Sequence, residues 1–154
     1  MIVLFRGVLN MVVKWDSSMS VGEKTIDQQH QQLLTEVNNL VGVISSSDLN
    51  MGDLRKSLHF LHGYIQEHFT YEESYMESNG YPGLEKHKKI HQSFVKFYDD
   101  FQEELREKCN VKDFSLTDVK KLLEKIEKYL TDWLIKHIKG EDQKYFKYIK
   151  AHSK

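Results

Sequence analysis

The stretch N-G-Y-P-G-L-E-K-H-K-K-I-H at residues 79–91 ends one helix and begins another, and it carries two histidines on the second. Its first five residues combine one Asn, one Pro and two Gly, which form the clearest helix stop in the chain. His87 and His91 follow four residues apart, so on a helix their imidazoles lie one above the other on the same face. The stretch therefore predicts two helices joined by a tight turn, with two candidate metal ligands on one face of the second.

On both sides of this stretch, apolar residues recur at steps of three and four, as in amphipathic helices. One proline and eight glycines in 154 residues also favour long helices over a turn-rich β fold. Asp53 and Ser115 are the predicted N-caps of the second and fourth helices. The predicted helices cover residues 27–45, 54–78, 84–108, 116 to beyond 137, and 143–151. We predict an all-α fold, an antiparallel up-down-up-down four-helix bundle with an N-terminal extended arm and a short C-terminal helix.

Each long segment also carries histidines or acids on its apolar side. His30 lies on the stripe of the first helix, and His68 with Glu72 forms a four-residue pair on the second. His137 and Asp142 are five apart, which on a regular helix turns the aspartate about 140° away from the histidine. We expect a local π-type turn near Gly140 that brings Asp142 back to the same centre.

This donor set predicts two transition-metal ions rather than one. Imidazole with carboxylate suits iron, zinc, manganese or copper, and the absence of clustered thiols argues against an iron–sulfur or structural Cys-type zinc site. Five imidazoles, two bidentate carboxylates and one shared oxygen bridge fill eleven of the twelve positions of two six-coordinate ions. The vacant position suits a small ligand such as dioxygen. A set of ligands with only two acids also carries less negative charge than a carboxylate-rich di-iron site. This lower charge favours the ferrous pair and reversible binding of the small ligand.

Composition narrows the function further. A net charge of -1 gives no electrostatic basis for nucleic-acid binding, and the single Cys109 excludes an internal disulfide framework. The apolar N-terminal run is interrupted by Arg6, is too short to span a bilayer and lacks the pattern of a signal peptide. Because Met11 precedes V-V-K-W-D, we interpret residues 1–14 as an N-terminal extension and 15–154 as a single domain. We expect a cytoplasmic monomer that has no membrane partner.

The ordered set T-I-D-Q-Q-H (25–30), H-F-T-Y-E-E (68–73), G-Y-P-G-L-E-K-H-K-K-I-H (80–91) and W-L-I-K-H-I-K-G-E-D-Q-K-Y (133–145) resembles bacterial hemerythrin. The resemblance extends from about Trp15 to Tyr145. It implies a non-enzymatic protein that binds dioxygen reversibly, as a carrier, store or sensor, at two iron ions (Fe2+/Fe3+) with a bridging oxo or hydroxo group. The resemblance also implies which residues bind each ion. One iron is bound by His87, His91 and His137, and the other by His30 and His68. The two carboxylates of Glu72 and Asp142 bridge both irons.

Other residues are weaker candidates. We predict that a dry ligand pocket is lined by Tyr64, Ile65, Trp133 and Leu134, and that Tyr145 supports the centre beside Asp142. Three more histidines, His59, His62 and His152, are interpreted as surface residues. Two alternative functions use the same ligands: a di-iron oxidase, peroxidase or nitric-oxide-scavenging enzyme, and a sensory module that acts through a separate partner. The sequence contains no second substrate pocket or cofactor motif that would favour an enzyme.

Overall fold

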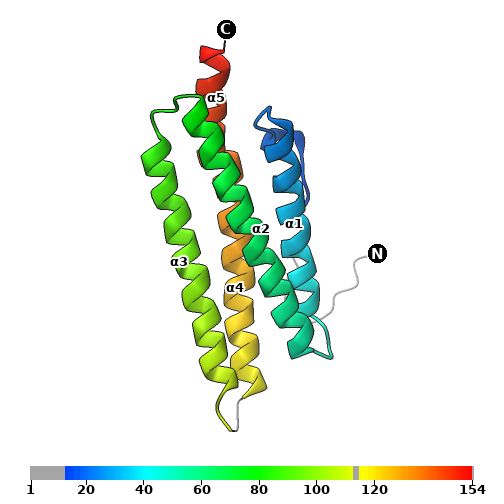
Figure 1. The fold of residues 1–154 in the computed structure, drawn as a ribbon. Helices are drawn as coiled ribbons and strands as arrows, with labels where there is room; N and C mark the ends of the chain where they lie inside the picture. Colours follow the sequence, from blue (N-terminus) through cyan, green and yellow to red (C-terminus); the bar gives the residue numbers. More distant parts are fainter. Residues whose placement is uncertain (1–12, 113–114, 154) are drawn as a thin grey trace, which may run out of the picture.

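The fold is an antiparallel bundle of four long helices, α1 to α4, with a short fifth helix that extends α4 (Figure 1). The structure is a computed structural model that describes residues 13–112 and 115–153. Within these residues there is no β-strand. The elements are η1 (Ser17–Met19), α1 (Lys24–Ile44), α2 (Met51–Ser78), α3 (Leu84–Cys109), α4 (Leu116–Lys136), the π-helical turn η2 (His137–Glu141) and α5 (Asp142–His152). This architecture confirms the predicted fold class.

Local signals set the helix ends. Ser115 caps α4 as predicted, since its side chain accepts a hydrogen bond from the backbone N–H of Asp118 at 3.3 Å. The predicted cap at Asp53 is wrong, because Asn50 accepts from the N–H of Asp53 at 3.1 Å and α2 begins at Met51. Asp53 instead lies in the first turn, where a carboxylate favours the helix dipole. After α2, Gly80 adopts a left-handed φ of 63°, as expected for the predicted stop.

The inner faces of the four helices form one continuous core of leucine, isoleucine, valine and aromatic side chains. A smaller cluster closes the end of the bundle near α5 and contains Val21, Ile26, Met76 and Tyr145. The candidate metal ligands lie between these two clusters, so apolar side chains cover them from both directions along the bundle axis.

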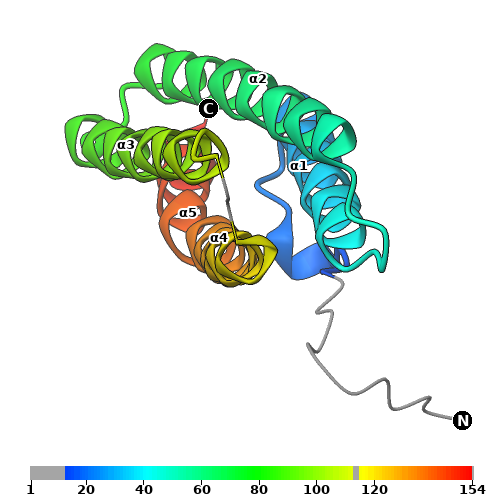
Figure 2. The same cartoon turned by 90° about the horizontal axis from the view of Figure 1, so that it is seen from below.

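The described part of the N-terminal arm lies between α1 and α4 (Figure 2). Val13 is buried, and its backbone exchanges hydrogen bonds of 3.0 and 2.8 Å with the side chain of Asn38 on α1. Asp16 contacts Lys139 of η2 at 3.1 Å, so the arm joins two sides of the bundle. Of the predicted extension, residues 1–12 lie outside the described residues. In the part of the chain that is described, no helix has both the length and the apolar character required to cross a membrane.

Candidate metal centre

The antiparallel order of the helices brings all seven predicted ligands to the same end of the bundle. They lie within the first eight residues of α1 and α3, in the C-terminal half of α2, and where α4 passes into η2 and α5. Chain segments that run in opposite directions therefore meet at one level. All seven side chains are buried, with residue exposures between 0% and 4%: His30, His68, Glu72, His87, His91, His137 and Asp142.

A π-helical turn brings Asp142 to the centre, which confirms the predicted departure from a regular helix. The backbone N–H of Asp142 donates to the carbonyl of His137, five residues earlier, and this widens the turn. As a result Asp142 Oδ1 lies 3.0 Å from His137 Nε2. A Cβ at Gly140 would meet no other atom within 4 Å, so the turn does not require glycine at that position.

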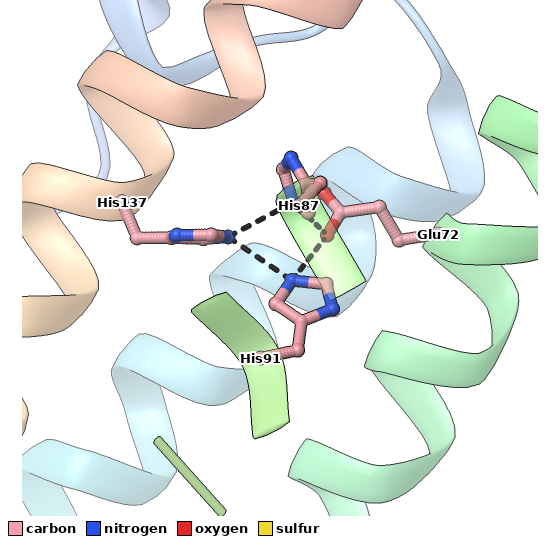
Figure 3. A group of neighbouring side chains, drawn as sticks. All are labelled: Glu72, His87, His91 and His137. Carbon is pink, nitrogen blue, oxygen red and sulfur yellow. Dashed lines mark hydrogen bonds and ion pairs between the residues drawn. The ribbon is translucent and has the colours of Figure 1, made fainter. Parts of the chain in front are cut away.

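Three imidazoles and one carboxylate form a first cluster, which we call the three-histidine group (Figure 3). The Nε2 atom of His137 lies 3.1 Å from the Nε2 atoms of both His87 and His91. Glu72 Oε2 lies 3.1 Å from His91 Nε2 and 3.4 Å from His87 Nε2. Ligand atoms about 2.1 Å from a metal and at right angles around it would be ~3.0 Å apart, so these separations fit a bound ion.

His30, His68, Glu72 and Asp142 form a second cluster, the two-histidine group. The Nε2 atoms of its two imidazoles are 3.1 Å apart, and Asp142 Oδ2 lies 3.2 Å from His30 Nε2. The other oxygen of Asp142, Oδ1, lies 3.3 Å from His87 Nε2 in the first cluster. Glu72 likewise contacts both clusters, since its Oε1 is 3.8 Å from His30 Nε2. Both carboxylates are therefore placed between the two groups.

The polar atoms of the site fit a bound cation better than a hydrogen-bonded core. Glu72 Oε2 and both oxygens of Asp142 are buried and have no hydrogen-bond donor in suitable geometry among the described residues. Leaving charged oxygens in this condition inside a protein is strongly unfavourable without a compensating charge. The Nε2 atoms converge on the carboxylates instead of pointing to outside partners. The residues present thus fit two metal ions that share two carboxylates.

The electrostatics show how strongly the carboxylates attract positive charge. Burial lowers the pKa of His30 and of His87, but the attraction of the nearby carboxylates of Asp142 and Glu72 outweighs it and raises both to about 9. At His68 the effect of burial is larger than the attraction of the carboxylates, and the pKa falls to about 3. Burial raises the pKa of Glu72, yet the surrounding imidazoles hold it well below its usual value. Two imidazolium ions therefore balance two carboxylates, a role that metal ions could take over.

Three further side chains hold the ligands in place. Tyr145 is fully buried, and its hydroxyl donates to Glu72 Oε1 at 2.6 Å. The hydrogen bond of Tyr145, which was predicted to support the centre beside Asp142, is made to the other carboxylate, on α2. His68 Nδ1 lies 2.9 Å from Gln29 Oε1, and His91 Nδ1 lies 2.7 Å from Glu73 Oε1. Sequence reasoning missed Gln29 and Glu73, whose only signal is that each is directly adjacent to a ligand.

An apolar cavity lies one helical turn beyond the ligands, in the direction of the main core. Its volume is about 10 Å³, which is room for about one water-sized molecule. Three of the residues that were predicted to line a ligand pocket line this cavity: Ile65, Trp133 and Leu134. The structure does not bring Tyr64 there. Its side chain is 37% exposed and borders a surface hollow next to His68, because it lies about 100° around α2 from Ile65.

The remaining histidines lie outside the centre. His59 and His152 are exposed, and His62 is partly exposed and pairs with Asp99 at 3.4 Å. Two of the ligands also stack on aromatic rings. Phe69 stacks on His91 with centroids 3.7 Å apart, and Trp133 stacks on His137 at 4.3 Å.

Comparison with known proteins identifies the family. The Hemerythrin HHE cation binding domain matches residues 21–149, and the chain belongs to this family. A bacteriohemerythrin from Stenotrophomonas maltophilia is 27% identical over 138 residues, which cover 90% of this chain and 82% of the relative. A myohemerythrin from Theromyzon tessulatum is 31% identical over 133 residues, covering 86% and 89%. The crystal structure of a hemerythrin point mutant matches with a TM-score of 0.73 at 23% identity, over 90% of this chain and 97% of the other.

Proposed function

We propose that the chain binds dioxygen reversibly at a pair of iron ions, and does not consume it. The observation that carries the proposal is the unequal division of the imidazoles, three in one group and two in the other, around two shared carboxylates. An ion held by the three-histidine group would have one more imidazole donor than an ion held by the two-histidine group, which would leave the second ion room for a small ligand. Relatives named hemerythrin and myohemerythrin support the same function.

Iron ions held in these two groups would supply the electrons that dioxygen takes up on binding and returns on release. The histidines contribute neutral donors, and only Glu72 and Asp142 contribute negative charge. This set of ligands stabilises the oxidised metal less than a carboxylate-rich set would. It therefore favours the release of dioxygen over cleavage of the O–O bond.

The surrounding residues exclude water and hold the bridging groups. The cavity below the ligands is bounded by aliphatic and aromatic side chains, so a small apolar molecule can occupy it without displacing hydrogen bonds. The Tyr145 hydroxyl fixes the Glu72 oxygen that faces His30, and burial raises the pKa of that hydroxyl well above its usual value. Tyr145 therefore remains a neutral hydrogen-bond donor beside the centre.

The test is the visible spectrum of the iron-loaded protein, first without oxygen and then aerated. The proposal predicts about two iron ions per chain and a charge-transfer band that appears on aeration and disappears when oxygen is removed. Steady consumption of dioxygen, peroxide or nitric oxide in the presence of a reductant would instead indicate an enzyme. A colourless aerobic protein with tightly bound zinc would contradict the proposal.

A further inference from the structure

Gln29 and Glu73 occupy equivalent places around the two halves of the centre. Each is adjacent in sequence to one ligand and bonds the outer nitrogen of a histidine on the next helix. Gln29 of α1 accepts from His68 of α2, and Glu73 of α2 accepts from His91 of α3. Both are half-buried, and each borders a surface hollow that also contains its histidine.

These contacts determine which ring nitrogen carries the proton. The side-chain oxygen of a glutamine or a glutamate can only accept, so Nδ1 must donate in both pairs. The Nε2 atoms of His68 and His91 are then bare and face the carboxylates and imidazoles of the centre. This is the tautomer that a metal ion at the centre requires.

The two acceptors differ in charge although they occupy equivalent places. A carboxylate that accepts from an imidazole N–H forms a charge-assisted bond and makes the opposite nitrogen a stronger donor to a cation. An amide fixes the same tautomer without adding negative charge. The chain thus gives the three-histidine group an anionic support and the two-histidine group a neutral one.

We propose that Gln29 and Glu73 are positioning residues whose difference in charge sets the order in which the two metal positions fill, the three-histidine position first and the two-histidine position second. The inference rests on the proposed pair of metal ions. It goes further by attributing to Gln29 part of the lower metal affinity that this order of filling requires at the two-histidine position.

The experiment is an anaerobic titration of the metal-free protein with Co2+, followed by its visible absorption. We expect two separate binding steps. Glu73→Gln should weaken the first step about tenfold and leave the second unchanged, whereas Gln29→Glu should strengthen the second about tenfold, within the range for residues that support metal ligands. The double variant Q29E/E73Q should bring the two steps together.

Two measurements separate positioning from a general structural effect. In the metal-free protein, where no ion dictates the tautomer, ¹⁵N spectra should show the His68 proton on Nδ1, and Gln29→Leu should remove this preference while Gln29→Glu retains it. Thermal unfolding of each variant shows whether it folds, and Gln28→Leu and Glu77→Gln serve as controls because both residues are exposed on the same helices. The inference is overturned if every variant changes both steps equally, or if His68 of the metal-free protein carries its proton on Nε2. Because no oxygen is involved, failure of dioxygen binding would overturn only the proposed function.

Discussion

The three-histidine and two-histidine groups share two carboxylates but differ in how tightly their rings are held. In the three-histidine group, the ring of His91 is stacked on Phe69 with an interplanar angle of 5° and bonded to Glu73. His137 is stacked on Trp133 at 10°. In the two-histidine group, the ring of His30 is tilted by 42° to Trp15 at a centroid distance of 6.3 Å, and its Nδ1 has no hydrogen-bond partner among the described residues.

Under the proposed function, this difference would make the two metal positions unequal. Stacked aromatic rings and a carboxylate acceptor restrict two of the three imidazoles of one group, which would suit a metal ion that stays in place. The other group offers one imidazole fewer, and His30 lacks these restraints, which would leave that position free to accept and release a ligand.

Removing the charge of Asp142 should damage both groups at once. Asp142→Asn keeps the size of the side chain but removes the anion that lies between His30, His87 and His137. Because the loss of a residue that only supports a ligand already costs 10–100-fold in metal affinity, we expect a decrease on the order of 100-fold or more for both ions. Metal content after dialysis measures it, with Asp132→Asn as the control. Two retained ions would contradict the shared position of this carboxylate.

Removing one histidine from each group should have unequal results. His68→Leu should leave about one tightly bound metal ion per chain and abolish the colour change on aeration, since the other group remains complete. His91→Leu should weaken the tighter binding step, because it removes a donor from the better-held group. Metal content and Co2+ titration distinguish the two variants, and His62→Leu, which lies outside the centre, should behave as the parent. Equal losses in both variants would show that the groups do not differ.

Protons should compete with metal in both groups. His30 and His87 have pKa values of about 9 in the metal-free protein, so both are protonated at pH 7 and must lose their protons to bind metal. Metal uptake at pH 7 should release about two protons, and the apparent affinity should rise up to roughly 100-fold per pH unit until pH approaches 9. Calorimetry in two buffers of different ionisation enthalpy counts the protons. If metal uptake releases no protons at pH 7, the carboxylates do not hold these imidazolium ions.

Tyr145→Phe should have the smallest effect of the four. It removes the hydroxyl that donates to the Glu72 oxygen facing His30, and a hydrogen bond to a charged group contributes about 1.5–3 kcal/mol. We expect the free energy of unfolding of the metal-free protein to decrease by that amount, and less in the loaded protein, where metal satisfies Glu72. Urea unfolding measures both. Tyr148→Phe is the control and should change stability by less than about 0.5 kcal/mol.

Helix periodicity was sufficient to predict the bundle and to place six of the seven candidate ligands on an inner face. The five-residue gap between His137 and Asp142 also predicted the π-helical turn, because a regular helix would direct these side chains apart. The start of α2 was less certain, since Asn50 and Asp53 are both good capping residues and only the backbone path distinguishes them. These features depend on local geometry, which a sequence encodes directly.

Contacts between helices could not be predicted in the same way. Gln29 and Glu73 lie one position away from the ligand face, so they reach a histidine only because the neighbouring helix lies at that side. Tyr145 is three residues after Asp142, which suggested Asp142 as its partner, but the length of its ring brings the hydroxyl to Glu72. Tyr64 is next to a cavity residue in sequence and faces solvent in the fold. Each of these depends on how the helices are rotated against one another.

The most direct test of the account is a crystal structure of the iron-loaded protein with anomalous diffraction measured at the iron edge. The account predicts two iron peaks about 3.5 Å apart. One should be bound by the Nε2 atoms of His87, His91 and His137, the other by those of His30 and His68, with Glu72 and Asp142 bound to both. A single enclosed iron, or two irons with Asp142 turned away from them, would contradict it.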